Sequence, residues 1–158
     1  MRIIVFSDSH GNTYSLDEAL YKIGKFDAII HLGDVQSDVD YLEALYSDVP
    51  IYSVLGNNDF FASGDHEKTI TIDGYKIFIA HGHTLGVHID TERLIKAAKR
   101  EGAQAALFGH THRALLEHTD GILVLNPGST SRPRSGKPSF AVIETDEKLD
   151  AVIVDWML

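Results

Sequence analysis

The chain has 158 residues, of which 44% are hydrophobic and 23% charged, and it carries a formal net charge of −9 with no cysteine. This composition is ordinary for a globular protein and excludes the disordered, collagen-like and disulfide-stapled classes. The length, together with the lack of any Pro/Gly/Ser-rich linker, predicts one domain over residues 1–158.

The acidic balance argues against long nucleic acids as ligands, because no cluster of Lys and Arg follows the pattern of a phosphate backbone. No segment reaches the roughly 18 apolar residues of a membrane span, and the N-terminal apolar run is too short for a signal peptide. We therefore expect a cytoplasmic protein with no membrane contact. The sequence leaves homo-oligomerisation open. Without thiolates, any metal site must use oxygen and nitrogen ligands.

Eight short apolar runs rich in Val and Ile predict β-strands. They cover residues 3–6, 28–32, 51–55, 75–80, 105–108, 122–125, 140–143 and 151–154. Apolar residues at helical spacing predict helices over about 16–23, 39–45 and 94–98. Asp73-Gly74 and Asp120-Gly121 predict two tight hairpins, so we expect mixed sheets in an α/β fold.

Five of the predicted strands are followed by residues that commonly bind metals. These are Asp8 and His10, Asp34, Asn57 and Asp59, His81 and His83, and His110 and His112, in chain order. In open α/β sheets, ligands bind outside the carboxyl ends of the strands, so the five loops can converge on one cleft.

The spacing within two of these loops suggests chelation. Asp8 and His10 are two residues apart, as are His110 and His112, and an extended chain points both members of such a pair to the same side. The carboxylate of Asp34 can bridge two cations. Two cations about 3.5–4 Å apart form the clamp used in phosphoryl chemistry, so this pattern predicts hydrolysis of a phosphate ester.

Taken together, the motifs resemble those of the calcineurin-like metallophosphoesterase superfamily. They are Asp8-x-His10, Gly33-Asp34, Gly56-Asn57-x-Asp59, His81-Gly82 and Gly109-His110-x-His112, in that order. The small size, the Gly56-Asn57-Asn58-Asp59 form and the later Asn126-Pro127-Gly128-Ser129 resemble its YfcE-like phosphodiesterase branch. The resemblance implies two packed mixed β-sheets flanked by helices, in a four-layer α/β/β/α sandwich with all five motif loops at one edge.

The resemblance also implies a role for each motif residue. Asp8, His10 and His112 would hold one divalent metal ion, Asn57, His81 and His110 would hold a second, and Asp34 would bridge them. A hydroxide bound between the metals would attack the phosphorus of a small phosphate ester, as in a phosphodiesterase. We expect manganese, with nickel, iron, zinc or magnesium as alternatives.

One position departs from the superfamily pattern. Many members place His directly after the ligand Asn, where it is thought to orient the phosphate and help protonate the leaving group, and here that residue is Asn58. An amide can donate a hydrogen bond but cannot deliver a proton. We therefore assign Asn58 and Asp34 to catalysis and Asn58 and His83 to substrate contact. His83 and His88 are candidates for an alternative acid.

Several other residues have a structural interpretation beside the functional one. Asp59 is either a ligand or a carboxylate that orients a ligating histidine, and we leave it out of the ligand set. Asn12 is expected to cap a helix that begins near Thr13, and His31 to be packed and hydrogen-bonded. His66 and His118 are expected to be solvated.

Two segments near the C-terminus leave alternatives open. Residues 126–129 form either a tight turn between strands or a loop whose amides face the site. Arg132 and Arg134 follow closely, and Arg pairs well with phosphate, although solvation is the commoner state of such residues.

Two other functions compete with the phosphodiesterase. One is a phosphomonoesterase or nucleotide phosphatase. The other is a non-catalytic interaction scaffold like the metallophosphoesterase-like retromer subunit, which also lacks the His after the motif Asn. The full set of candidate ligands in this chain, including His10, favours the enzyme.

Overall fold

The computed structural model describes residues 1–157, which form two mixed five-stranded sheets packed face to face. The first sheet has the order β10-β9-β1-β2-β3, with bounds β10 Asp150–Asp155, β9 Ser139–Glu144, β1 Arg2–Phe6, β2 Ala28–His31 and β3 Ile51–Ser53. The second has the order β4-β5-β6-β8-β7, with bounds β4 Glu67–Ile72, β5 Tyr75–Ala80, β6 Ala105–Leu107, β8 Ile122–Asn126 and β7 Leu115–Thr119. In the first sheet, β1, β2 and β3 are parallel, and the antiparallel β9 and β10 lie beside β1. In the second, β5, β6 and β8 are parallel, with the antiparallel β4 and β7 at the two edges.

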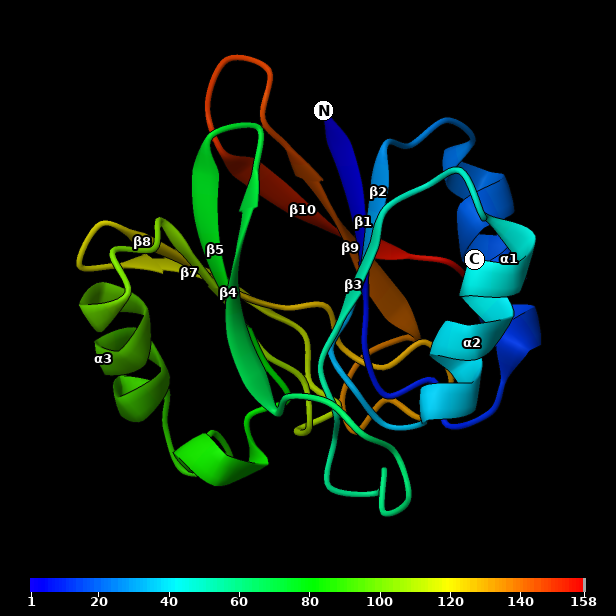
Figure 1. Ribbon diagram of the computed structural model, residues 1–158, viewed down its shortest axis with the longest axis horizontal. Helices are drawn as coiled ribbons and strands as arrows, with labels where there is room; N and C mark the ends of the chain where they lie inside the picture. Colours follow the sequence, from blue (N-terminus) through cyan, green and yellow to red (C-terminus); the bar gives the residue numbers. More distant parts are fainter. Residues whose placement is uncertain (158) are drawn as a thin grey trace.

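Three α-helices cover the outer faces of the two sheets. In Figure 1, α1 (Thr13–Ile23) and α2 (Gln36–Leu45) lie beside the first sheet, and α3 (Glu92–Arg100) lies on the opposite side of the molecule beside the second. A short 3-10 helix, η1 (His83–Leu85), precedes α3. The four-layer α/β/β/α sandwich expected from the sequence is confirmed. Among residues 1–157, no helix has both the length and the apolar character needed to cross a membrane.

The alternation of side chains along β1 shows how the layers are held together. Ile3 and Val5 point into the core between the two sheets, whereas Ile4 and Phe6 point into the core beneath α1 and α2. Successive side chains of a strand face opposite sides, so a strand buried on both faces reads as a continuous apolar run. The same alternation on β5 sends Ile79 between the sheets and Phe78 toward α3.

Both predicted Asp-Gly hairpins are present. Asp73 and Gly74 have φ of 50° and 82° between β4 and β5, and Asp120 and Gly121 have φ of 53° and 78° between β7 and β8. Two residues with positive φ are the mark of the turn that best matches the twist of a hairpin. The predicted helix cap at Asn12 is also present, because its Oδ1 accepts from the Ser15 amide at 3.1 Å at the start of α1.

Candidate metal centre

The structure brings the seven predicted metal ligands to one edge of the sandwich. The loops that carry them leave the carboxyl ends of β1, β2, β3, β5 and β6, and the loops after β1, β2 and β3 can be followed at the lower edge of Figure 1. The imidazole Nε2 of His112 lies 3.3 Å from Oδ1 of Asp8 although more than a hundred residues separate them. The convergence expected from the strand-end motifs is therefore observed.

Three of the residues form the first potential metal site, namely Asp8, His10 and His112, whose ligand atoms lie within 4.8 Å of one another. His10 Nε2 is 3.2 Å from His112 Nε2 and 3.9 Å from Asp8 Oδ1. One carboxylate and two imidazoles at these separations can surround a single divalent cation.

Asp8, Asp34 and His81 form the second potential site, and all three are buried. His81 Nε2 lies 3.6 Å from Asp34 Oδ2 and 3.9 Å from Asp8 Oδ1. The Asn57 amide oxygen closes this side, because it lies 3.0 Å from both His81 Nε2 and His110 Nδ1. Asp34 Oδ2 is also 4.0 Å from His10 Nε2, so this carboxylate stands between the two sites.

The two oxygens of Asp8 have different environments. Oδ2 accepts from the Ser7 hydroxyl at 2.6 Å and from the His110 amide at 2.9 Å, which fixes the carboxylate plane. Oδ1 is buried and has no hydrogen-bond partner within residues 1–157, yet it belongs to both potential sites. A buried carboxylate oxygen without a partner is costly, and a bound cation would satisfy it. The donor set therefore fits divalent metal ions.

Hydrogen bonds from the rings fix which nitrogen of His81 and His112 faces the centre. Nδ1 of His81 lies 2.7 Å from the Leu32 carbonyl, and Nδ1 of His112 lies 2.7 Å from the Arg132 carbonyl. A carbonyl can only accept, so each Nδ1 carries a hydrogen and each Nε2 is the nitrogen that faces the centre. Histidine ligands are commonly oriented in this way.

The charge states of the site suit a metal. Burial opposes ionisation of Asp8, but His112, His81 and Ser7 outweigh this effect and hold the pKa of the carboxyl below its ordinary value. Desolvation lowers the pKa of His10 and His110, so both rings are neutral near pH 7, the form that binds a metal. The Asp8 carboxylate instead raises the pKa of His112, so a cation bound there would displace a proton.

The backbone of the site is strained in a way that the sequence did not indicate. Five of the seven candidate ligands adopt left-handed dihedrals, with φ of 55° at Asp8, 51° at His10, 46° at Asp34, 68° at His110 and 56° at His112. Such conformations cost about 1–3 kcal/mol each and cluster at functional sites. The expectation that Asp8 and His10 share a side because the chain is extended was wrong. Both follow the end of β1, and their left-handed turns bring the side chains together.

Comparisons with known proteins agree with this geometry. The family model of the calcineurin-like phosphoesterase superfamily domain matches residues 1–148. The chain belongs to this superfamily. A probable metallophosphoesterase of Bacillus subtilis is 34% identical over 90% of this chain and 83% of its own length. A crystal structure from Streptococcus pneumoniae, of a conserved uncharacterized protein described as a predicted phosphoesterase, has a TM-score of 0.83 at 32% identity and covers 98% of this chain and 89% of that one.

Two further relatives carry names that point to different functions. A phosphodiesterase of Methanocaldococcus jannaschii is 27% identical over 94% of this chain and 95% of its own length. Vacuolar protein sorting-associated protein 29 of Schizosaccharomyces pombe is 30% identical over 94% of this chain and 80% of its own length. The superfamily therefore includes relatives with and without an enzymatic name.

A cavity of about 330 Å³ lies over the centre. Its lining residues are His10, Asp34, Asn57, Asn58, His110, His112, Arg132 and Arg134. The two arginines, for which solvation was the commoner expectation, are exposed but line this cavity. Within residues 1–157 neither guanidinium pairs with a carboxylate. Each is therefore available to an anion at the centre.

Asn58, where this chain departs from many superfamily members, contacts Asp34. Its backbone amide lies 3.0 Å from Asp34 Oδ1, and its side-chain amide donates to Asp34 Oδ2 at 2.7 Å. Asn58 also lines the cavity, so the predicted contact with substrate stays open. The ring of His83 lies 5.4 Å from that of His81, and His83 is not among the residues that line this cavity. Its contact with substrate stays a prediction.

Asp59 acts on backbone amides. Its Oδ2 accepts from Gly56 at 2.7 Å and from Asp34 at 3.2 Å, and its Oδ1 accepts from Gln36 at 2.7 Å. The idea that it orients a ligating histidine was wrong. It ties the loop after β3 to the loop after β2 and satisfies an amide at the start of α2, where an acidic group is favoured.

Buried polar residues that the sequence did not single out brace the ligand loops. The Ser129 hydroxyl donates to the Asp8 carbonyl at 2.8 Å, and the Asn126 side chain donates to the Gly109 carbonyl at 3.1 Å. Neither the turn nor the amide interpretation of residues 126–129 anticipated this role. The predicted packed His31 is fully buried, accepts from the Gly33 amide at 3.2 Å and contacts the Ser9 hydroxyl at 2.8 Å. Buried hydrogen bonds therefore fix the backbone of the loops that carry the ligands.

Gly56→Ala tests how tightly the second site is packed. An added Cβ would lie 1.8 Å from Asp34 Oδ1 and 2.6 Å from the Asp34 amide, so the bridging carboxylate must move. We expect a loss of roughly 10- to 100-fold in affinity for manganese, typical of residues that support metal ligands, measured by calorimetric titration. Gly136→Ala is the control, because it has a φ of 71° but open space around it. Equal affinities in both variants would contradict this account.

Proposed function

We propose that this protein is a metal-dependent phosphodiesterase that holds two divalent cations on either side of Asp8 and Asp34. The observation that carries the proposal is Asp8 Oδ1, which is buried, unpartnered within residues 1–157 and common to two clusters of ligand atoms. The superfamily membership and the relative named as a phosphodiesterase support it.

Different residues would hold the two cations. His10 and His112 would hold one cation with Asp8, and His81, Asn57 and His110 would hold the other, with Asp34 between them. When bound, the cations would supply charge to stabilise the phosphoryl oxygens and lower the pKa of water enough for attack at neutral pH. Asn58 keeps the Asp34 carboxylate in place.

Arg132 and Arg134 supply the binding of the phosphate. Both guanidiniums line the cavity over the centre, and a guanidinium stays charged at any physiological pH. Bidentate pairing with phosphate oxygens would hold the ester with its phosphorus over the centre. In a chain with a net charge of −9, such a local cationic wall would counter the repulsion of an anionic substrate.

The oxygen and nitrogen donors suit manganese, with nickel, iron, zinc and magnesium as alternatives. A small phosphate ester as substrate and a reaction in the cytoplasm complete the proposal.

The test is a metal series with two substrates of equal leaving group, bis(4-nitrophenyl) phosphate and 4-nitrophenyl phosphate. We expect hydrolysis to require added divalent metal and to favour the diester. Preference for the monoester would replace the proposal with a phosphomonoesterase.

The resemblance to vacuolar protein sorting-associated protein 29, at 30% identity, makes a non-catalytic scaffold the second candidate. Such a protein could keep the metal site without turnover. Absence of metal-dependent hydrolysis across a broad panel of phosphate esters, in protein that binds two metal ions, would favour the scaffold.

Asn58→His tests the departure from the superfamily pattern. The imidazole adds a group that titrates near neutral pH and can donate a proton to a leaving group. We expect activity on alkyl monoesters, which have poor leaving groups, to rise relative to activated diesters. The substitution also removes the hydrogen bond from the Asn58 side chain to Asp34, so total activity can fall. Asn58→Ala is the control, because it loses that hydrogen bond without gaining an acid, and the same substrate ratio in both variants would refute the prediction.

A further inference from the structure

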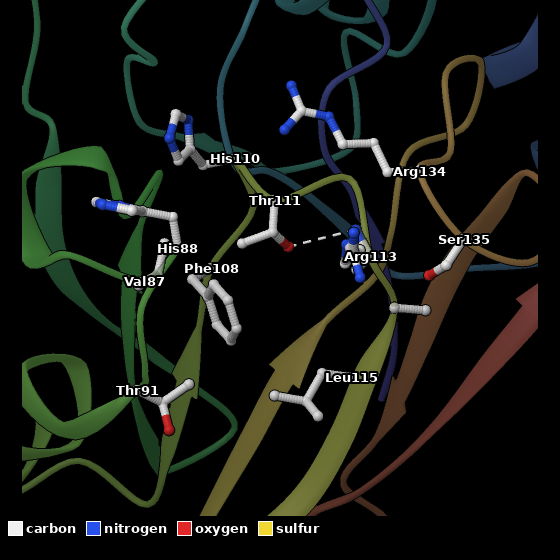
Figure 2. Close-up of a pocket in the computed structure, with 11 residues that line it drawn as sticks. Val87, His88, Thr91, Phe108, His110, Thr111, Arg113, Leu115, Arg134 and Ser135 are labelled. Carbon is white, nitrogen blue, oxygen red and sulfur yellow. Dashed lines mark hydrogen bonds between the residues drawn. The ribbon is translucent and has the colours of Figure 1, made fainter.

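A second cavity, of about 620 Å³, opens beside the proposed metal centre (Figure 2). Its lining residues are Val87, His88, Thr91, Phe108, His110, Thr111, Arg113, Ala114, Leu115, Arg134 and Ser135. His110 and Arg134 line both cavities, so the two are contiguous. The volume is within the range of about 300–1,000 Å³ that is usual for small-molecule sites.

One part of this cavity is apolar. Val87, Phe108 and Leu115 contribute to its wall, and Figure 2 shows Phe108 and Leu115 on the side away from His110 and Arg134. Phe108 and Val87 are only 3% and 6% exposed because they also pack in the core beneath α3. These two side chains are therefore fixed in place, and with the more accessible, half-buried Leu115 they form a rigid floor for a flat or ring-shaped apolar group.

The rest of the wall is cationic. Arg113 and Arg134 line the cavity, whereas none of its eleven lining residues is Asp or Glu, in a chain with 23 acidic and 14 basic residues. Within residues 1–157, neither guanidinium forms an ion pair. Their backbones are held next to a candidate ligand, because Arg113 follows His112 and the Arg134 amide donates to the His112 carbonyl at 3.0 Å.

From this wall we infer that the cavity binds the alcohol portion of the substrate, and that this portion is an aromatic or similar apolar ring with an anionic substituent, a carboxylate or a phosphate. The inference rests on the proposed phosphodiesterase function. A diester carries two organic groups on phosphorus, and a neighbouring cavity gives one of them a binding surface. Hydrolysis would break the P–O bond to this alcohol, while water supplies a hydroxyl to phosphorus and a proton to the departing oxygen.

The test compares two diesters, methyl 4-nitrophenyl phosphate and methyl 3-carboxy-4-nitrophenyl phosphate. The carboxylate is meta to the departing oxygen, so the two leaving groups have similar intrinsic reactivity. We expect kcat/KM to favour the carboxylated ester by about tenfold, as one charge-assisted hydrogen bond would supply. A third ester with a phosphonate in place of the carboxylate shows which anion the wall prefers.

Arg113→Gln is the decisive variant, because Arg113 lines the side cavity but not the cavity over the centre. We expect the ratio of kcat/KM values to fall to about one, with the plain methyl 4-nitrophenyl ester little affected. Ser135→Asp, made in the wild-type chain, adds a carboxylate at an exposed position of the same wall and should also lower the ratio below the wild-type value. Arg100→Gln removes an equal charge from the exposed end of α3, away from the lining residues, and should keep the wild-type ratio.

Binding of the product to metal-free protein separates this inference from the proposed function. After chelation, 5-hydroxy-2-nitrobenzoate should bind wild-type protein and Arg100→Gln alike, about tenfold more weakly to Arg113→Gln, and 4-nitrophenol should not distinguish the three. If wild-type protein with added metal hydrolyses neither ester but the product binds in this pattern, the proposed phosphodiesterase function is overturned and the cavity assignment stands. Hydrolysis with no preference for the carboxylated ester, or equal product binding by wild type and Arg113→Gln, would overturn the cavity assignment.

Discussion

Asp34→Asn is expected to remove nearly all hydrolysis while the fold survives. Asp34 Oδ2 lies 3.6 Å from His81 Nε2 and 4.0 Å from His10 Nε2, so its charge serves both potential sites. An amide has the same size but no charge and only one ligand oxygen. Metal ions contribute several kcal/mol to transition-state stabilisation, so we expect kcat to fall by roughly 10³-fold or more, measured with a diester at saturating manganese.

The matched control is Asp40→Asn, which removes a carboxylate from an exposed position in α2. It should keep wild-type activity and bind two metal ions, whereas Asp34→Asn should bind less than two by elemental analysis. Circular dichroism and melting in chelator should be alike in all three proteins. Wild-type turnover by Asp34→Asn would remove the bridge from the proposed centre.

The buried strands were predictable because they are apolar on both faces. β1, β2 and β5 read as continuous runs, and the structure places them at the predicted positions within one or two residues. The edge strands β4 and β7 were predicted only as the arms of hairpins. In β4, polar residues alternate with apolar ones, as at Thr69 and Thr71. In β7, polar residues follow one another at Glu117 and His118. Both strands lie at an edge of the second sheet, where one side faces solvent. Polar residues on that side weaken the apolar signal.

The identity of the site residues was predictable, but the way they are held together was not. Asp8, His10 and His112 stand in a recognisable order at strand ends, and topology alone brings such ends to one edge. Left-handed dihedrals at Asp8 and His10 leave no trace in the sequence, because neither residue type requires them. Bracing by Ser129 was equally hidden, since a hydroxyl at residue 129 gives no sign that it will meet a carbonyl at residue 8.

The side chains around the second site show a similar limit. Asn58 was assigned from its position in a motif, but its hydrogen bond to Asp34 depends on the geometry of two loops. Asp59 read as a partner for a histidine because such pairs are common at metal sites, whereas three backbone amides compete successfully for its oxygens. Contacts between loops depend on the backbone conformation of those loops, and this is harder to predict from a single sequence than the positions of strands and helices.

Removal of metal is expected to abolish activity and to lower the melting temperature. Without cations, Asp8 Oδ1 stays buried without a hydrogen bond, with His112 Nε2 at 3.3 Å as its nearest charged neighbour, and no metal bond offsets the strained backbone at Asp8, Asp34 and His110. A ligand that binds only the folded state stabilises it by about 2.7 kcal/mol at a hundredfold excess over its Kd. With two such sites, and roughly 2–4 °C per kcal/mol for a chain of this length, chelation should lower the melting temperature by about 10–20 °C.

Differential scanning calorimetry with manganese, and then with excess chelator, measures this shift. Asp40→Asn should show the full shift, because it leaves every ligand in place. Asp34→Asn should show a smaller one, because it weakens metal binding itself while retaining the rest of both clusters. Readdition of manganese should restore both activity and melting temperature, since the ring nitrogens of His81 and His112 are fixed by backbone carbonyls rather than by the metal. An unchanged melting temperature in chelator, with only trace metal in protein reconstituted beforehand, would refute the dinuclear centre.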